Sequence, residues 1–92
     1  MIGEFCVVRT FSAGVHMGIV KECNGTAVLL ADARRLWRWR GANTLHEVSQ
    51  AGVGQGSRIS KPVPLILLTQ VIEVIPCSLF ARKSLESDRW DN

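Results

Sequence analysis

Runs of β-branched and apolar residues, separated by small flexible residues, dominate the first thirty positions and predict strands. Three such runs lie at 5–10, 15–22 and 26–30. Residues 12–14 (Ser-Ala-Gly) separate the first two runs and suit a turn. Asn24 and Gly25 separate the next two, and this pair is a strong hairpin signal because both residues tolerate the positive φ of a type I′ turn. The pattern therefore predicts an antiparallel meander.

A fourth strand is predicted over 34–40, after a possible break at Asp32 and Ala33. Side chains alternate between the two faces of a strand. Positions 34, 36, 38 and 40 would then present a cationic face, and positions 35, 37 and 39 a mainly aromatic one. Gly18, inside the second run, predicts a bulge or the close approach of a ligand or another backbone.

The second half of the chain predicts two short helices. Thr44 and Glu47 form a capping box, and Gly52 suits the end of a two-turn helix. Ser78 would cap a last helix that starts at Leu79 and ends near position 87. The glycine-rich stretch between 52 and 57 lacks the flanking elements and the Lys-Ser/Thr pair of a phosphate-binding loop, so a plain flexible loop is expected.

Apolar runs at 65–68 and 71–75 complete the predicted sheet, as one bent strand or two, and 58–61 reads as a short edge strand. Pro62 and Pro64 limit backbone donation there. We therefore expect a small α+β fold: a mainly antiparallel sheet of four to six strands, covered on one face, with two short helices. Residues 1–92 are expected to form a single domain.

The formal charge of +3 comes largely from segment 34–40, which holds four of the eleven basic residues and no acidic one. This patch is shorter than the broad basic surface of a dedicated DNA-binding domain. The three cysteines lie far apart and form no metal-ligand spacing, so a reducing cytosol is expected, with neither metal nor cofactor. No apolar run is long enough to span a membrane, and no catalytic motif is recognisable, so a non-enzymatic cytoplasmic protein is expected.

Segment 34–40 also holds two of the three tryptophans, and two interpretations of it remain open. In the first, the indoles enter the core or a subunit interface and the arginines are solvated. In the second, arginine binds phosphate and indole stacks on a ring, next to the small turn at 12–14. The second interpretation predicts a ligand site made of Arg9, Ser12, Gly14, His16, Arg34, Arg35, Trp37, Arg38 and Trp39.

Four stretches resemble a family of bacteriophage and prophage proteins of about ninety residues: RTFSAGVHMG at 9–18, ARRLWRWRGA at 33–42, VPLILLT at 63–69 and IEVIPC at 72–77. The resemblance covers nearly the whole chain. It implies an accessory protein that acts against host immunity in the cytoplasm of the host cell. The functional class it suggests is the nucleotide sponges, which sequester signalling nucleotides of Thoeris- or CBASS-type defence, such as cyclic oligonucleotides or cyclic ADP-ribose. No ligand residues are carried over from the family.

Two other functions fit segment 34–40, which we call the Arg/Trp segment. The protein could be an inhibitor that docks on a host defence protein, since Trp and Arg are enriched in binding hot spots. It could also bind nucleic acid through arginine contacts and tryptophan stacking. In addition, a homodimer or larger symmetric oligomer is expected, because a short chain with long apolar runs leaves surface to cover, and Trp90 is a candidate anchor.

Overall fold

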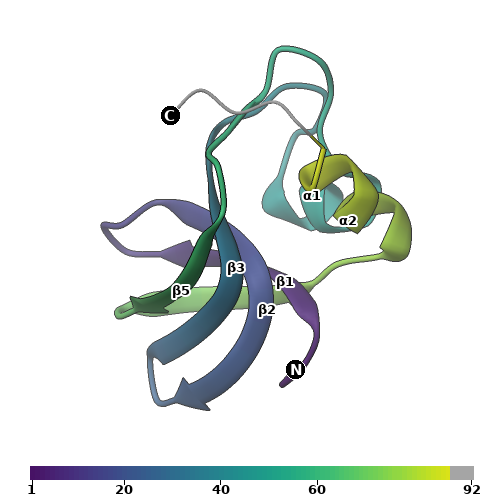
Figure 1. Cartoon of the computed structure of the whole chain (residues 1–92). Helices are drawn as coiled ribbons and strands as arrows, with labels where there is room; N and C mark the ends of the chain where they lie inside the picture. The colour runs from purple at the N-terminus through teal and green to yellow at the C-terminus, as the bar shows by residue number, and fades with distance from the viewer. Residues whose placement is uncertain (88–92) are drawn as a thin grey trace.

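The chain forms a curved antiparallel sheet with two helices packed together at one end, as the computed structural model in Figure 1 shows. The structure describes residues 1–87, and Trp90 lies outside them. Within these residues the expected α+β class is confirmed. The elements are β1 (Phe5–Thr10), β2 (Val15–Asn24), β3 (Ala27–Arg38), α1 (Leu45–Ala51), β4 (Arg58–Ile59), β5 (Val63–Leu68), β6 (Val71–Pro76) and α2 (Leu79–Leu85).

The sheet has the strand order β4-β3-β2-β1-β6, and β5 also pairs with β3. All these pairs are antiparallel. Residues 69 and 70 join β5 to β6, although β5 pairs with β3 and β6 pairs with β1, the two outer strands of the β1–β2–β3 meander. The sheet must therefore curl back on itself, as Figure 1 shows. The connecting turn closes the curl, because the amide of Val71 donates to the Thr26 carbonyl (2.9 Å) and the amide of Phe11 donates to the Gln70 carbonyl (3.0 Å).

Strand β3 is continuous from Ala27 to Arg38, so the predicted division into a third and a fourth strand is wrong. The predicted break at Asp32 is instead a bulge. Met17 pairs with Arg34 and Ile19 with Ala31, so Gly18 on β2 faces two residues of β3. Asp32 absorbs the extra residue at φ 50°. The close approach expected at Gly18 is present, because a Cβ there would lie 2.7 Å from the Ala31 carbonyl oxygen.

Both faces of β1 are buried, so the expectation of a sheet covered on one face is wrong. Phe5 and Val7 pack on the helix side, in a cluster with Met17, Leu36, Leu45, Val48, Val53, Ile59 and Leu85. Cys6 and Val8 point into the curl of the sheet, where they pack with Val20, Val28, Leu30, Ala33 and Leu68. Curling covers the second face without a second layer of helices, which is why a short chain can bury both faces of its central strand.

The helix caps follow the sequence prediction. The Thr44 hydroxyl accepts from the Glu47 amide (3.2 Å), and the Glu47 carboxylate accepts from the Asn43 amide (3.0 Å). Gly52 follows α1 at φ 74°, and its amide donates to the Val48 carbonyl. Ser78 caps α2 by accepting from the Ala81 amide (3.0 Å), although α2 ends at Leu85 rather than near 87. Neither helix in residues 1–87 has the length and apolarity needed to cross a bilayer.

Candidate functional site

The tight turn between β1 and β2 lies beside the end of β3 and forms the first of three adjoining hollows, which we call the turn hollow. It has a volume of about 490 Å³. The pairing of Val15 with Leu36 and of His16 with Arg35 brings the two segments together. The structure thus brings together five of the predicted site residues, and the lining comprises Ser12, Ala13, Gly14, Val15, Arg35, Leu36, Trp37 and Trp39.

Hydrogen bonds from both flanking strands fix the turn. Thr10 at the end of β1 accepts from the Ala13 amide (2.8 Å) and donates to the Gly14 carbonyl (2.9 Å). His16 on β2 is 2% exposed, and its Nε2 lies 2.9 Å from the Ala13 carbonyl oxygen. Burial lowers the pKa of His16 below its usual 6.5, and the nearby charge of Arg35 lowers it further, while the hydrogen bond to Ala13 acts in the opposite direction. A neutral imidazole that donates from Nε2 fits this environment.

The second hollow, which we call the basic hollow, has a volume of about 300 Å³ and shares Arg35 with the turn hollow. Arg34 and Lys61 also line it, so three cationic side chains border one depression. Ser60 fixes the backbone at Arg35, because its hydroxyl accepts from the Arg35 amide (2.8 Å) and its own amide donates to the Arg35 carbonyl (2.9 Å). The other lining residues are His16, Ala33, Ser60, Val63 and Ile66.

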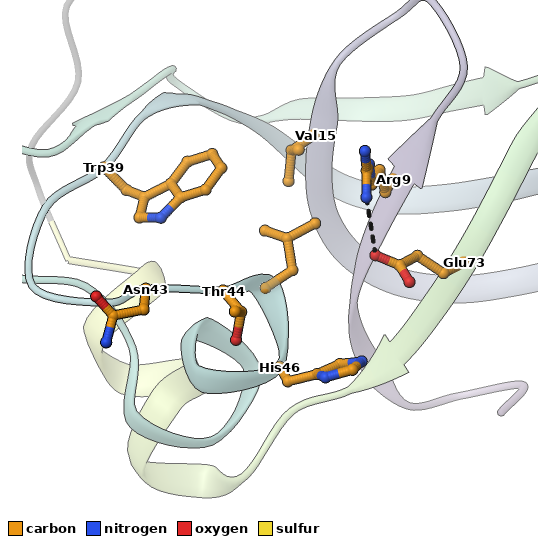
Figure 2. Close-up of a pocket in the computed structure, with 8 residues that line it drawn as sticks. Arg9, Val15, Trp39, Asn43, Thr44, His46 and Glu73 are labelled. Atoms are coloured by element: carbon orange, nitrogen blue, oxygen red, sulfur yellow. Dashed lines mark ion pairs between the residues drawn. The ribbon is translucent and has the colours of Figure 1, made fainter.

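The third hollow lies next to the start of α1, and we call it the α1 hollow. It has a volume of about 450 Å³ and is drawn in Figure 2. Arg9 on β1 and Glu73 on β6 stand directly opposite each other in the sheet, and their side chains form an ion pair at 3.7 Å. Figure 2 shows this pair on the opposite side of the hollow from Trp39. The lining comprises Arg9, Val15, Trp39, Asn43, Thr44, Leu45, His46 and Glu73.

Val15 and Trp39 line both the α1 hollow and the turn hollow, so these two side chains form the boundary between them. Arg35 likewise lines both the turn hollow and the basic hollow, so the turn hollow shares lining residues with each of the other two. A ligand with several chemical groups could therefore occupy more than one of them.

Alternation had predicted that Trp37 and Trp39 share one face of a strand, but Trp39 lies beyond the end of β3. The pairing of β3 with β4 shifts between Leu36 and Arg38, and β3 ends at Arg38. Trp39 is half-buried and packs against the helix-side core that contains Leu36. Trp37 is 50% exposed and lines the turn hollow. Trp39 is therefore partly in the core, as the first interpretation predicts, whereas Trp37 is accessible to solvent.

Of the nine predicted site residues, Arg38 lines none of the three hollows. It is exposed and stands opposite Arg58 on β4. Sequence reasoning missed Asn43, Thr44, His46 and Glu73. Thr44 carried a visible signal as a helix cap, but only the pairing of β6 with β1 brings Glu73 to Arg9, and no local pattern reveals that pairing.

Burial raises the pKa of two of the three thiols well above neutral pH, so Cys6 and Cys77 are protonated there. Burial, with a smaller contribution from Cys6, raises the pKa of Cys77 to about 12. Burial likewise raises the pKa of Cys6 to about 11. Within residues 1–87, no group of three or more His, Cys, Asp or Glu side chains is placed to hold a metal ion.

Residues 3–85 match the sequence model of a family described as Domain of unknown function (DUF6948). No curated protein and no solved structure gives a significant match.

Proposed function

The chain belongs to the DUF6948 family, and we propose that it is a non-enzymatic binding protein that captures a nucleotide. The observation that carries this proposal is the turn hollow, where a braced turn of small residues faces Arg35 and two indoles. A phosphate and a ring are the two chemical groups that this lining complements.

Phosphate would bind at Arg35 and the turn. A guanidinium group can donate two parallel hydrogen bonds to a phosphate. Ser60 holds the Arg35 backbone at both its amide and its carbonyl, so the position from which the side chain extends is fixed before binding. The bonds from Thr10 and His16 likewise fix the turn. Such preorganisation reduces the entropy lost on binding.

The basic hollow would accept further negative charge. Arg34 and Lys61 lie around it and share the depression with Arg35. A ligand with a second phosphate could therefore place one on each side of Arg35. This favours a dinucleotide or a nucleoside diphosphate over a nucleoside monophosphate.

An exposed or half-exposed indole provides the surface for a ring. Trp37 is 50% exposed, and Trp39 presents part of its surface to two hollows. Stacking of a base on an aromatic side chain contributes about 1–3 kcal/mol. Arg35 and the two indoles would thus hold the two ends of a nucleotide.

The phage resemblance gives this proposal its biological role. We propose that the protein sequesters a host immune signalling nucleotide, of the cyclic oligonucleotide or cyclic ADP-ribose type, without cleaving it, in the cytoplasm of the host cell. The residues proposed to hold it line the turn and basic hollows: Ser12, Gly14, His16, Arg34, Arg35, Trp37 and Trp39.

A protein inhibitor is the second candidate function. Phe11, at 77% exposure, adjoins the same turn, and with Trp37 it gives the surface two exposed aromatic side chains. Aromatic residues and arginine are enriched in protein-binding hot spots. Pull-down from host lysate after removal of nucleic acid and small molecules would retain a stoichiometric protein partner if this function is correct.

Isothermal titration calorimetry tests the proposed nucleotide binding. The ligand panel contains AMP, GMP, cyclic dinucleotides and ADP-ribose. Arg35→Ala should weaken the best ligand roughly 10- to 100-fold, which corresponds to the loss of a hydrogen bond to a charged group. Arg38→Ala is the matched control, because Arg38 comes from the same strand but lies outside all three hollows, and it should leave affinity within about twofold.

Two results would contradict the proposal. One is the absence of binding by every nucleotide in the panel at about 100 µM protein, provided that circular dichroism shows a folded chain. The other is an equal loss of affinity in the Arg35 and Arg38 variants, because general electrostatic attraction would then explain binding without a defined site.

A further inference from the structure

The α1 hollow has a lining that the proposed phosphate contacts leave unused. Val15 and Leu45 provide apolar surface, and both belong to or pack against the helix-side core, so their positions are fixed. Trp39 borders one side, and the Arg9–Glu73 pair borders the opposite side (Figure 2). The volume of about 450 Å³ lies in the range of small-molecule sites. An apolar floor with polar groups at its edge suits a flat heterocycle.

The ion pair sets the hydrogen-bonding pattern at that edge. The closest atoms, Arg9 Nη1 and Glu73 Oε1, are 3.7 Å apart, which is longer than a hydrogen bond. Their side chains are 54% and 36% exposed. The guanidinium group carries five N–H donors, and the carboxylate has two oxygens that accept. The pair therefore keeps donors and acceptors for a ligand, side by side.

Guanine matches this pattern better than the other bases. Its pairing edge carries the O6 acceptor next to two donors, N1–H and the N2 amino group. Both oxygens of Glu73 can accept from the two donors while Arg9 donates to O6, a base atom that arginine commonly contacts. Adenine and cytosine each offer only one donor group on this edge. Either base would therefore make one hydrogen bond fewer to the carboxylate than guanine makes.

Resting on the nucleotide-binding function proposed above, we infer that the α1 hollow binds the base of the nucleotide and selects guanine through Glu73 and Arg9. The shared boundary connects this site to the phosphate contacts. Val15 and Trp39 line both hollows, so a sugar that crosses Trp39 would carry its phosphate to Arg35 and the turn. Trp37 then remains for a second ring of a larger ligand.

The wild-type protein gives the first test, by calorimetry with GMP, IMP, AMP and CMP. IMP is GMP without the N2 amino group. We expect GMP to bind roughly 10-fold more tightly than AMP or CMP, with IMP weaker than GMP by about 3- to 10-fold because one hydrogen bond to Glu73 is lost.

The second test uses Glu73→Gln, which keeps the size of the side chain but replaces one accepting oxygen with a donor group. We expect it to lower GMP affinity roughly 10-fold and to leave AMP within about twofold, which removes the preference for guanine. Glu86→Gln is the matched control, because Glu86 pairs with Arg82 on α2 and lines none of the three hollows. It should keep the wild-type order of ligands. Thermal unfolding of each variant checks that it folds.

The outcomes separate this inference from the proposed function. If nucleotides bind but GMP and AMP have equal affinity, or if the guanine preference survives Glu73→Gln, the inference is wrong and the proposed function stands. If neither ribose 5-phosphate nor any nucleotide binds, the proposed function fails, and the assignment of the base site fails with it.

Discussion

The Nε2 atom of His16 lies 2.9 Å from the carbonyl oxygen of Ala13, so a buried imidazole on β2 holds the turn that lines the proposed phosphate site. Because a carbonyl oxygen only accepts, Nε2 carries the proton in this contact. Thr10 holds the same turn from β1. The geometry of the turn therefore depends on the two strands beneath it and is present before any ligand arrives.

This contact predicts a pH dependence of stability. Burial lowers the pKa of His16 in the folded chain below the 6.5 of an unfolded chain. Below about pH 6.5 the unfolded state takes up a proton that the folded state excludes, so stability falls as the pH decreases through this range. Urea unfolding at several values between about pH 5 and pH 7.5 should show this fall.

His16→Gln should reduce that pH dependence. Carboxylates contribute to the slope of both proteins, so the difference between wild type and variant isolates the imidazole. The free energy of unfolding of the variant should change less between pH 7.5 and pH 5 than that of the wild type. Parallel curves for the two proteins would contradict the assignment of a buried neutral imidazole.

The two tryptophans on the Arg/Trp segment should differ in their effects on stability. Trp39→Ala removes a half-buried indole that packs against the helix-side core, and we expect a loss of roughly 2 kcal/mol. Trp37→Ala removes an exposed one, so a change within about 0.5 kcal/mol is expected. Denaturant unfolding measures both. Equal losses would show that the two side chains have similar environments.

Gly18→Ala should destabilise the fold because a Cβ at this position would lie 2.7 Å from the Ala31 carbonyl oxygen and 3.2 Å from the Ala33 Cα. Both are backbone atoms of the β3 bulge, so neither can rotate away. A loss of about 1–3 kcal/mol is expected for such overpacking. If Gly18→Ala unfolds at the wild-type urea concentration, the bulge does not approach β2 as closely as described.

Self-association is also predicted. Leu65 and Leu67 are 58% and 63% exposed on β5, which pairs with β3 along one edge and with no further strand in residues 1–87. Exposed apolar side chains on such an edge favour contact with another chain. Light scattering should therefore report a homodimer or larger oligomer, and Leu67→Asp should lower the mass while Thr69→Asp should not. A single-chain mass for the wild type at high micromolar concentration would contradict the prediction.

The elements that depend on short-range signals were predicted well. A tight hairpin joins β2 to β3 as expected, and Thr44 and Ser78 cap the two helices as expected. The predicted type I′ turn is wrong, because Asn24 pairs with Ala27, which makes Gly25 and Thr26 the turn residues, and only Gly25 has a positive φ (62°). Each of these features is decided by residues within about four positions of one another. The same kind of local signal gave a wrong prediction at Asp32. This turn-forming residue predicted a break between two strands, but it lies in a bulge inside one long strand.

Features that depend on contacts distant in sequence were not predicted. Curling of the sheet buries Cys6 and Val8 on a face expected to be open. The pairing of β6 with β1 brings Glu73 beside Arg9. The candidate site shows the same division. The turn at 12–14 and Arg35 were proposed from their chemistry, and they line one hollow, whereas the α1 hollow arises only when α1, β1 and β6 meet.

Titration of ¹⁵N-labelled protein with GMP, followed by NMR, tests the central claim most directly. If a nucleotide binds across the turn and α1 hollows, the amides of Ser12, Gly14 and Arg35 and the indole N–H of Trp39 should shift together along one saturating curve. Signals of Arg38 and of Leu67 should stay in place, because neither residue lines these hollows. Unchanged spectra at millimolar GMP, or shifts that are confined to Arg38 and β5, would contradict the account.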